Sequence, residues 1–214
     1  MGDVSLAPIL AERRTRRVGL LGGSFNPAHI GHLHISLMAL KRLNLDEVWW
    51  LVSPQNPLKS TSGMAPFAGR ISHAQAMTRH HPRIKVTGLE ALLDSPYTAD
   101  TLRQLRKRFP QTRFVWMMGA DNLRQISRWN HWLEIFRRVP IAVFARPTYS
   151  LSALSGMAAQ RFRHRRVEPH SARRLATMPA PAWSFFPIRL DHTSATELRR
   201  LGPKGGIAVS SKNS

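Results

Sequence analysis

The stretch that decides the fold of this chain is VGLLGGSFNPAHIGH, which runs from Val18 to His32. Residues 18–21 predict a short buried strand, and apolar residues recur at helical spacing over 32–40. The glycines between them permit a tight turn with close backbone approach. A strand, a glycine turn and a helix N-terminus bring backbone N–H groups together in one small volume. The stretch therefore predicts a phosphate-binding site.

Two histidines stand in this stretch where a P-loop has its lysine. The stretch also lacks the Gly-Lys-Ser/Thr ending of a P-loop and the three-glycine spacing of a dinucleotide-binding turn. His29 and His32 are three residues apart, so we expect both on one face of the first helical turn, within reach of the same anion. Imidazoles there can neutralise charge on a phosphoryl group during transfer. A metal site is the weaker alternative, because no third ligand follows at recognisable spacing.

The length and composition predict one domain. The chain has 214 residues, of which 43% are hydrophobic, enough for a substantial core. We expect a flexible N-terminal extension over 1–17, a single domain over 18–201 and a disordered tail over 202–214. A basic stretch at 166–181 predicts a mobile loop within the domain.

Charge and apolar runs restrict the class of protein. No apolar run approaches the length of a membrane span, and the N-terminus lacks the order of a secretory signal, so a cytoplasmic location is expected. The absence of cysteine excludes disulfides and thiolate metal sites. The formal net charge is +20, which raises the possibility of nucleic-acid binding. Because no RNA-binding or helix-turn-helix motif is present, we favour a basic but solvated surface on a phosphate-handling enzyme.

Strand and helix patterns alternate along the chain. Strands are predicted at 18–21, 47–52, 83–87, 113–118, 141–145 and 183–190, and helices at 32–40, 65–80, 97–109 and 150–165. This alternation predicts an α/β fold that is Rossmann-like and doubly wound, with a mostly parallel sheet and helices on both faces. Ligands of such sheets bind beyond the carboxyl ends of the strands. The glycine turn, the loop after Val52 and the residues from Gly119 to Asn122 should therefore form one site.

The segment GGSFNPAHIGH resembles the G-G-[ST]-F-[DN]-P-x-H-x-G-H signature of the HIGH-motif nucleotidyltransferases. More narrowly, the chain resembles the bacterial nicotinate mononucleotide adenylyltransferases from Val18 to about Leu201. The resemblance implies adenylyl transfer from ATP to nicotinate mononucleotide in NAD biosynthesis, giving nicotinate adenine dinucleotide and pyrophosphate. Phosphopantetheine or nicotinamide mononucleotide is the alternative acceptor. A basic nucleic-acid-binding protein on this scaffold is the alternative from another class.

The resemblance also assigns the residues that handle ATP. The backbone of the glycine turn would cradle ATP, and the two histidines would contact its phosphates, His32 being the stronger candidate for charge stabilisation. The segment from Ser194 to Arg199 resembles an I-S-[SA]-T-x-[IL]-R element that closes over the phosphates; an ordinary capped helix is the alternative. The expected catalytic residues are His29, His32 and Arg199. The expected ATP-binding residues are Gly22, Gly23, Ser24, Phe25, Gly119, Asp121, Ser194 and Thr196.

Two further segments concern ribose and pyridine binding. Asp121 follows a buried strand, where a carboxylate suits ribose hydroxyls; capping of the next helix is the alternative. Trp129-Asn130-His131-Trp132 resembles a W-x-x-W segment of the family. The resemblance implies that Trp129 stacks on the pyridine ring, whereas we expect Trp132 in the core.

The remaining matches concern the acceptor. Residues 95–102 resemble an S-x-Y-T-x-D-T-L element, which implies that the backbone near Tyr97 and Thr98 binds the nicotinate carboxylate. The alternative is a capped helix start with Tyr97 packed beneath it. Lys59 ends the loop Pro54-Gln55-Asn56-Pro57-Leu58-Lys59, which resembles a proline-containing family loop that ends in [HL]-K, and is expected to meet the acceptor phosphate. Arg146 matches an R-P-x-Y element and is expected to support the site or contact phosphate.

The implied chemistry needs no protein nucleophile. The attacking phosphate is already an anion, so catalysis consists of aligning two charged nucleotides and spreading charge over fixed donors and Mg²⁺. We expect the phosphates, rather than protein ligands, to hold most of the Mg²⁺ coordination. The expected partners are ATP and nicotinate mononucleotide, with neither a specific nucleic acid nor a membrane, and a homo-oligomer is possible.

Overall fold

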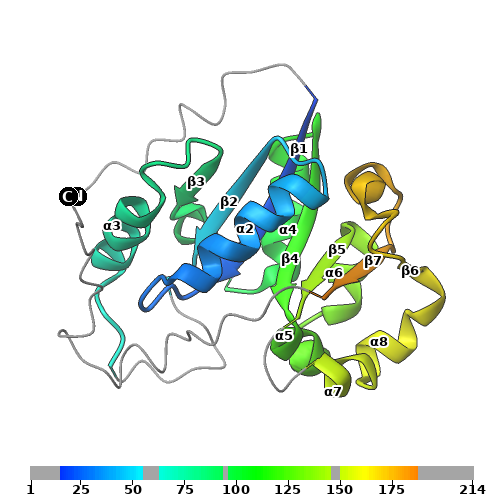
Figure 1. Ribbon diagram of the computed structural model, residues 1–214. Coiled ribbons are helices and arrows are strands. Elements are labelled where there is room, and N and C mark those ends of the chain that lie inside the picture. The colour runs from blue at the N-terminus through cyan, green and yellow to red at the C-terminus, as the bar shows by residue number, and fades with distance from the viewer. Residues whose placement is uncertain (1–14, 55–62, 94–95, 146–149, 188–214) are drawn as a thin grey trace, which may run out of the picture.

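Seven parallel strands form the centre of this computed structural model, which describes residues 15–54, 63–93, 96–145 and 150–187 (Figure 1). Every pair of neighbouring strands in this part of the chain is parallel. The sheet order is β3-β2-β1-β4-β5-β7-β6. The strands are β1 Arg16–Gly23, β2 Glu47–Val52, β3 Ile84–Thr87, β4 Thr112–Gly119, β5 Ile141–Phe144, β6 Arg166–Val167 and β7 Trp183–Phe186. The predicted Rossmann-like α/β fold is confirmed.

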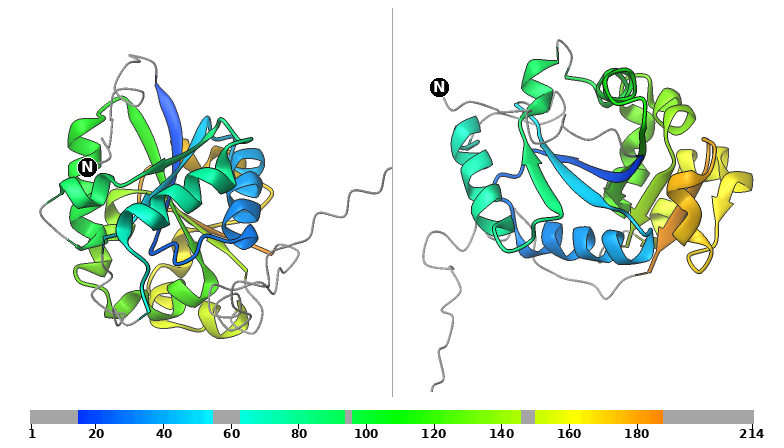
Figure 2. Two further views of the ribbon diagram at one scale, coloured as in Figure 1. Left: turned by 90° about the vertical axis from the view of Figure 1, so that its left-hand side faces the viewer. Right: turned by 90° about the horizontal axis from the view of Figure 1, so that it is seen from above.

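Helices connect the strands and cover both faces of the sheet (Figure 2). The α-helices are α2 Ile30–Arg42, α3 Phe67–Thr78, α4 Thr98–Arg108, α5 Ala120–Gln125, α6 Trp132–Arg138, α7 Ser150–Leu154 and α8 Met157–Arg161. The 3₁₀-helices are η1 Leu89–Leu92, η2 Ile126–Arg128, η3 Arg163–Arg165 and η4 Ala172–Thr177. Crossover helices of this kind are what parallel strands require.

The apolar side chains form one core on each face of the sheet. Val18 and Leu20 of β1 belong to the core under α4, α5, α6 and α8, whereas Leu21 belongs to the core under α2, α3 and η4. Trp49 and Trp50 of β2 divide between the two cores in the same way. Successive side chains of a strand point to opposite faces, so a continuous apolar strand serves both cores.

Most predicted elements are present with small shifts at their ends. The strand at 47–52 has the predicted bounds, and β1 is longer at both ends than the predicted 18–21. The strand predicted at 183–190 is observed as β7, and residues 188–190 lie outside the described part. The predicted extension and tail also fall largely on residues that the structure does not describe, so the domain limits stay predictions.

The continuous helix predicted over 150–165 is wrong. The structure divides this segment into α7, α8 and η3. Gly156 lies at the break in an extended conformation, and a Cβ there would come within 3.2 Å of the Ala153 carbonyl oxygen and 3.7 Å of the Arg124 Cα. Phe162 stacks on Phe136 of α6 with ring centroids 4.2 Å apart. Packing against α5 and α6 therefore overrides the helical periodicity.

The segment 166–181, expected as a basic mobile loop, contains β6 and η4. Three residues of η4 are buried in the same core as the apolar face of α2, namely Ala172, Leu175 and Ala176. The segment thus supplies an edge strand and a core element; its mobility stays a prediction.

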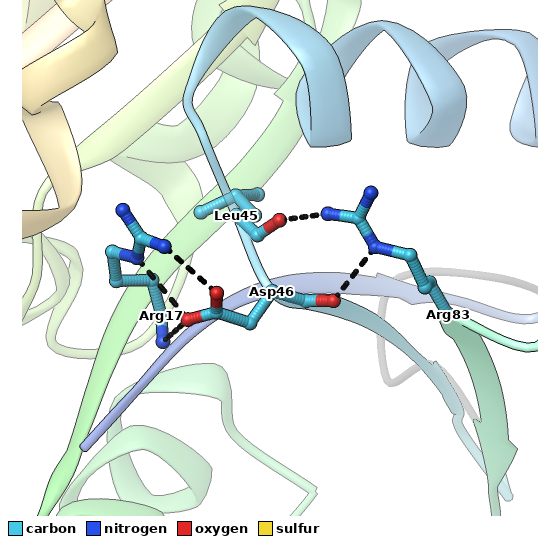
Figure 3. A network of polar contacts seen from close by, with 4 residues as sticks. All are labelled: Arg17, Leu45, Asp46 and Arg83. Carbon is cyan, nitrogen blue, oxygen red and sulfur yellow. Dashed lines mark hydrogen bonds and ion pairs between the residues drawn. The ribbon is translucent and has the colours of Figure 1, made fainter. Parts of the chain in front are cut away.

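The amino ends of β1 and β2 are joined by a polar network at the edge opposite the glycine turn (Figure 3). The Arg17 guanidinium donates to both carboxylate oxygens of Asp46, at 2.7 and 3.1 Å. This hydrogen bonding, more than the charge itself, holds the pKa of the Asp46 carboxyl below its usual value. Arg83 donates to the carbonyl oxygens of Asp46 and Leu45. The network fixes the start of β2 against β1 and β3.

Candidate active site at the carboxyl ends of the strands

The carboxyl ends of β1, β2 and β4 meet at one edge of the sheet, as predicted. Gly23 at the end of β1 is paired with Val52 at the end of β2, and the Ser53 amide donates to the Gly23 carbonyl at 2.9 Å. β4, the neighbour of β1 on the other side, ends at Gly119. The glycine turn, the start of the loop after β2 and the start of α5 therefore share this edge.

Gly22 lies so close to the neighbouring strand β4 that a side chain would not fit. A Cβ at Gly22 would lie 2.5 Å from Cη2 of the Trp116 ring on β4, and Trp116 is itself buried. The sequence pattern predicted a glycine for backbone approach to phosphate. The structure adds a packing reason that acts before any ligand binds.

Phe25 occupies a left-handed backbone conformation with φ of 46°, which is unusual for a residue with a side chain. Its ring is buried, stacked on Trp50 at a centroid distance of 5.0 Å and tilted against His32 at 4.7 Å. Burial of this ring compensates for the strained backbone. The stack fixes the path of the turn that leads into α2.

His29 and His32 form a reciprocal cap at the start of α2. Nδ1 of His29 accepts from the Gly31 amide at 3.2 Å, and Nδ1 of His32 accepts from the His29 amide at 3.2 Å. The ring centroids are 3.8 Å apart. Because each Nδ1 acts as an acceptor, the hydrogen of each neutral imidazole resides on Nε2. The structure thus brings the two histidines together, with His29 as the N-cap residue and not in the first turn.

A hydrogen-bond chain from Trp50 through Ser36 holds the backbone of His32. Sequence reasoning missed this feature. The Trp50 indole donates to the Ser36 hydroxyl at 2.8 Å, and that hydroxyl donates to the His32 carbonyl at 2.7 Å. Ser36 is buried four residues after His32, on the face of α2 turned to the sheet. The position of Ser36 on the apolar face of the predicted helix could have indicated this contact, because a buried hydroxyl needs a hydrogen-bond partner.

Asp121 lies in the first turn of α5, which follows β4 directly. The N-cap residue of α5 is Gly119, so the alternative of Asp121 as the helix cap is wrong. Asp121 is half-buried at the carboxyl edge of the sheet. This placement is compatible with a carboxylate that faces ribose hydroxyls.

Tyr97 and Thr98 lie at the start of α4. Tyr97 is the N-cap residue and is 38% exposed, so its ring does not pack beneath the helix as the alternative interpretation required. Its carbonyl accepts hydrogen bonds from the amides of Asp100 and Thr101, both at 3.0 Å. The Tyr97 ring therefore remains accessible to a ligand.

Glu90 lies under this helix start and was not singled out from the sequence. The Thr101 hydroxyl donates to Glu90 Oε1 at 3.5 Å. Burial raises the pKa of the Glu90 carboxyl to about 7, a shift that the hydrogen bond from Thr101 only partly opposes. A neutral carboxyl group thus supports α4 below neutral pH.

The two tryptophans of the W-x-x-W segment are both half-buried and pack against the same core. Trp132 begins α6 and meets the rings of Phe136 and Phe162 edge-on, at 6.2 and 6.1 Å. Trp129 follows η2 directly. Trp132 thus packs against the core without being fully buried, and stacking of Trp129 on a pyridine ring stays a prediction.

Five of the expected site residues lie outside the described residues. They are Lys59, Arg146, Ser194, Thr196 and Arg199. The proposed approach of Arg199 to the two histidines stays a prediction.

The described residues show neither a cluster of metal ligands nor a membrane-spanning helix. No group of three His, Cys, Asp or Glu side chains in this part of the chain is arranged to hold a metal ion. Within the same residues, no helix has both the length and the apolar composition of a membrane span.

Comparison with known proteins agrees with this geometry. Residues 20–201 match the cytidylyltransferase-like family. The chain is 52% identical over 186 residues to a probable nicotinate-nucleotide adenylyltransferase of Parvibaculum lavamentivorans, covering 87% of this chain and 92% of that protein. It is 51% identical over 183 residues to one of Methylorubrum extorquens, covering 86% and 98%.

A solved structure supports the fold alone, because its sequence identity is low. The nicotinic acid mononucleotide adenylyltransferase of Plasmodium falciparum complexed with NaAD has a TM-score of 0.64 at 16% identity, covering 86% of this chain and 83% of that one. The extent and level of the sequence matches place this chain in the nicotinate-nucleotide adenylyltransferase branch of the cytidylyltransferase-like family.

Proposed function

We propose that this chain transfers the adenylyl group of ATP to nicotinate mononucleotide, giving nicotinate adenine dinucleotide and pyrophosphate in NAD biosynthesis. The observation that carries the proposal is the paired cap of His29 and His32 at the carboxyl edge of the sheet, in a chain about half identical to relatives named for this reaction. Two Nε2–H donors and the start of a 13-residue helix suit an anionic triphosphate.

The reaction is a displacement at the α-phosphorus of ATP. A phosphate oxygen of nicotinate mononucleotide forms the new P–O bond, and the bond to the bridging oxygen of the leaving pyrophosphate breaks. No proton has to leave the attacking anion. The imidazoles of His29 and His32 donate from Nε2 to phosphate oxygens, which stabilises charge that develops in the transition state. Arg199 is proposed to add a third, cationic donor.

The other expected residues are proposed to bind and align the two nucleotides. On the ATP side they are the backbone from Gly22 through Gly23 and Ser24 to Phe25, with Gly119, Asp121, Ser194 and Thr196. On the acceptor side they are Lys59, Tyr97, Thr98 and Trp129, with Arg146 in support. Holding two reactants in line contributes much of the rate enhancement in reactions of this type.

A divalent cation, proposed to be Mg²⁺, is expected to bind together with the nucleotide. Phosphate oxygens would then supply most of its ligands, as is usual for this ion. When bound, the ion neutralises phosphate charge and polarises the α-phosphorus. We place the reaction in the cytoplasm.

Pyrophosphate release by the full chain tests the proposal. ATP would be offered with nicotinate mononucleotide, nicotinamide mononucleotide or phosphopantetheine as acceptor. The expected result is the highest kcat/KM with nicotinate mononucleotide, because the accessible start of α4 is proposed to bind its carboxylate. A preference for either other acceptor would contradict the proposed substrate.

A further inference from the structure

Arg70 of α3 is buried, with 2% of its surface exposed, and lies between segments of the candidate site. Its guanidinium donates to four carbonyl oxygens that belong to three separate segments. Nε donates to Ala65 at 3.0 Å, and one terminal nitrogen donates to both Ser24 and Ser53, the latter at 2.8 Å. The other terminal nitrogen donates to Pro54 at 2.8 Å. One side chain thus holds the glycine turn, the residues after β2 and the entry to α3.

The charge of Arg70 has no carboxylate partner within the described residues. Every polar contact of its guanidinium there is to a neutral carbonyl group, and the Phe67 ring lies 5.4 Å from its central carbon. Burial lowers the pKa of the Arg70 guanidinium, which still remains charged at neutral pH. A buried cation without a counter-ion is costly, and a bound polyanion nearby would offset that cost.

The contact with Ser24 has a consequence for the next amide. The peptide bond from Ser24 to Phe25 is trans, so its C=O and N–H point in opposite directions. With the Ser24 oxygen drawn toward Arg70, the Phe25 N–H is turned away from the guanidinium. Within the described residues this N–H donates no hydrogen bond to the protein. Within the described residues this backbone donor of the glycine turn is therefore oriented by Arg70 and left without a protein acceptor.

Asn26 reinforces the same arrangement. Its side chain donates to the Gly63 carbonyl and accepts from the Ala65 amide, both at 3.1 Å. The glycine turn is thus tied to the residues before α3 by two side chains. Only Arg70 also reaches Ser53 and Pro54, and only Arg70 brings charge.

We propose that Arg70 is a positioning residue for ATP: it turns the Phe25 amide toward the phosphates and adds an uncompensated positive charge behind the glycine turn. The planar guanidinium is essential to this role, because an ammonium group cannot serve four carbonyls in that geometry. The inference rests on the proposed function for the identity of the anion, and it extends that function to a residue outside the signature motif.

The test measures binding of a non-hydrolysable ATP analogue to the full chain, alongside kcat, the KM for each substrate and the thermal midpoint. Arg70→Met is expected to weaken analogue binding about 10- to 100-fold and to raise the KM for ATP more than the KM for the acceptor. Arg70→Lys is expected to recover only part of the affinity. Guanidinium ion added to Arg70→Ala is expected to restore affinity, whereas methylammonium is not.

Arg83→Met is the matched control, because Arg83 also donates to two backbone carbonyls but at the opposite edge of the sheet. It is expected to lower the thermal midpoint and to leave ATP affinity unchanged. If Arg70→Met lowers the midpoint while analogue affinity stays at the wild-type value, Arg70 is structural only and the inference is overturned. Should Arg70→Met fail to fold, wild-type affinity in Arg70→Lys would overturn it equally.

Analogue binding also separates this inference from the proposed function. A wild-type chain that binds the analogue but releases no pyrophosphate with nicotinate mononucleotide contradicts the proposed acceptor and leaves the role of Arg70 testable. A wild-type chain that does not bind the analogue contradicts the role of Arg70 as well.

Discussion

The two ring nitrogens of His29 have different roles: Nδ1 caps α2, and Nε2 is proposed to donate to a phosphate oxygen. Nδ1 caps α2 by accepting from the Gly31 amide, which leaves the hydrogen of the neutral ring on Nε2. The spacing of His29 and His32 predicted that the imidazoles share one anion. It did not predict that Nδ1 of each ring accepts from a backbone amide, that of Gly31 for His29 and that of His29 for His32. The tautomer is therefore set before any nucleotide binds.

Replacing His29 by asparagine separates the two tasks. The amide oxygen of asparagine can accept the capping hydrogen bond, but it cannot replace the Nε2–H donor. We expect His29→Asn and His29→Ala both to lower kcat about 10²- to 10³-fold, whereas the Asn variant should be more stable than the Ala variant by about 1 kcal/mol. Steady-state kinetics and urea unfolding of both variants measure this. A wild-type kcat in His29→Asn would exclude a chemical role for the ring.

Glu90 makes the free energy of unfolding depend on pH. The pKa of its carboxyl is about 7 in the folded state against 4.5 for an ordinary glutamate, so the folded protein binds the extra proton between these values. Stability from this residue is fully present below 4.5 and is lost as pH rises toward 7. Glu90→Gln removes the ionisation. We expect its free energy of unfolding to match wild type below pH 4.5 and to exceed it above neutral pH.

The control for Glu90 is Glu134→Gln on α6. Glu134 pairs with Arg137 and Arg138 at a more exposed position, so its effect should not grow over the same pH range. Urea unfolding at several pH values measures both differences. A Glu90→Gln difference that stays constant with pH would show that this carboxyl is already ionised in the folded chain.

The end of β1 is packed as tightly as a core. In Gly22→Ala the new methyl group would overlap the Trp116 ring of β4, so we expect a loss of about 1–3 kcal/mol in the free energy of unfolding. Gly69 of α3 is the matched control, because a Cβ there meets nothing within 4 Å. Gly69→Ala should raise stability by about 0.5–1 kcal/mol, the helical preference of alanine. Wild-type stability in Gly22→Ala would mean that the strands can separate at low cost.

Elements could be predicted from the sequence where the apolar pattern is long and bounded by turn residues. β2 has its predicted bounds, because the apolar run from Val48 to Val52 lies between a polar turn and Pro54 and allows few alternatives. The prediction failed over 150–165, where the helical periodicity continues but the backbone is extended at Gly156. Periodicity reports which residues are buried, whereas neighbouring elements decide whether the backbone continues.

The molecule as a whole carries its positive charge unevenly. Among the described residues from 150 to 187, the single acid is Glu168, and the exposed arginines are Arg161, Arg163, Arg165, Arg166, Arg173 and Arg174. Arg166 belongs to β6, a strand at one edge of the sheet, and its guanidinium carbon lies 5.6 Å from the centroid of the Trp183 ring. Like charges at a sheet edge oppose pairing with another chain. We therefore expect the charge of Arg166 to disfavour pairing of this edge with another chain.

The sequence by itself determined the fold class, the edge of the sheet that carries the site and the pairing of His29 with His32. These follow from local patterns, namely apolar runs, glycine turns and short spacings within one helical turn. Only the tertiary structure decided that Trp116 requires Gly22, that Trp50 and Ser36 brace His32, and that Arg70 joins three segments. Each of these contacts links residues far apart in the chain or depends on which face of an element is buried. The role of a buried donor such as Arg70 depends on which acceptors lie beside it in the folded chain. A local sequence pattern does not specify those acceptors.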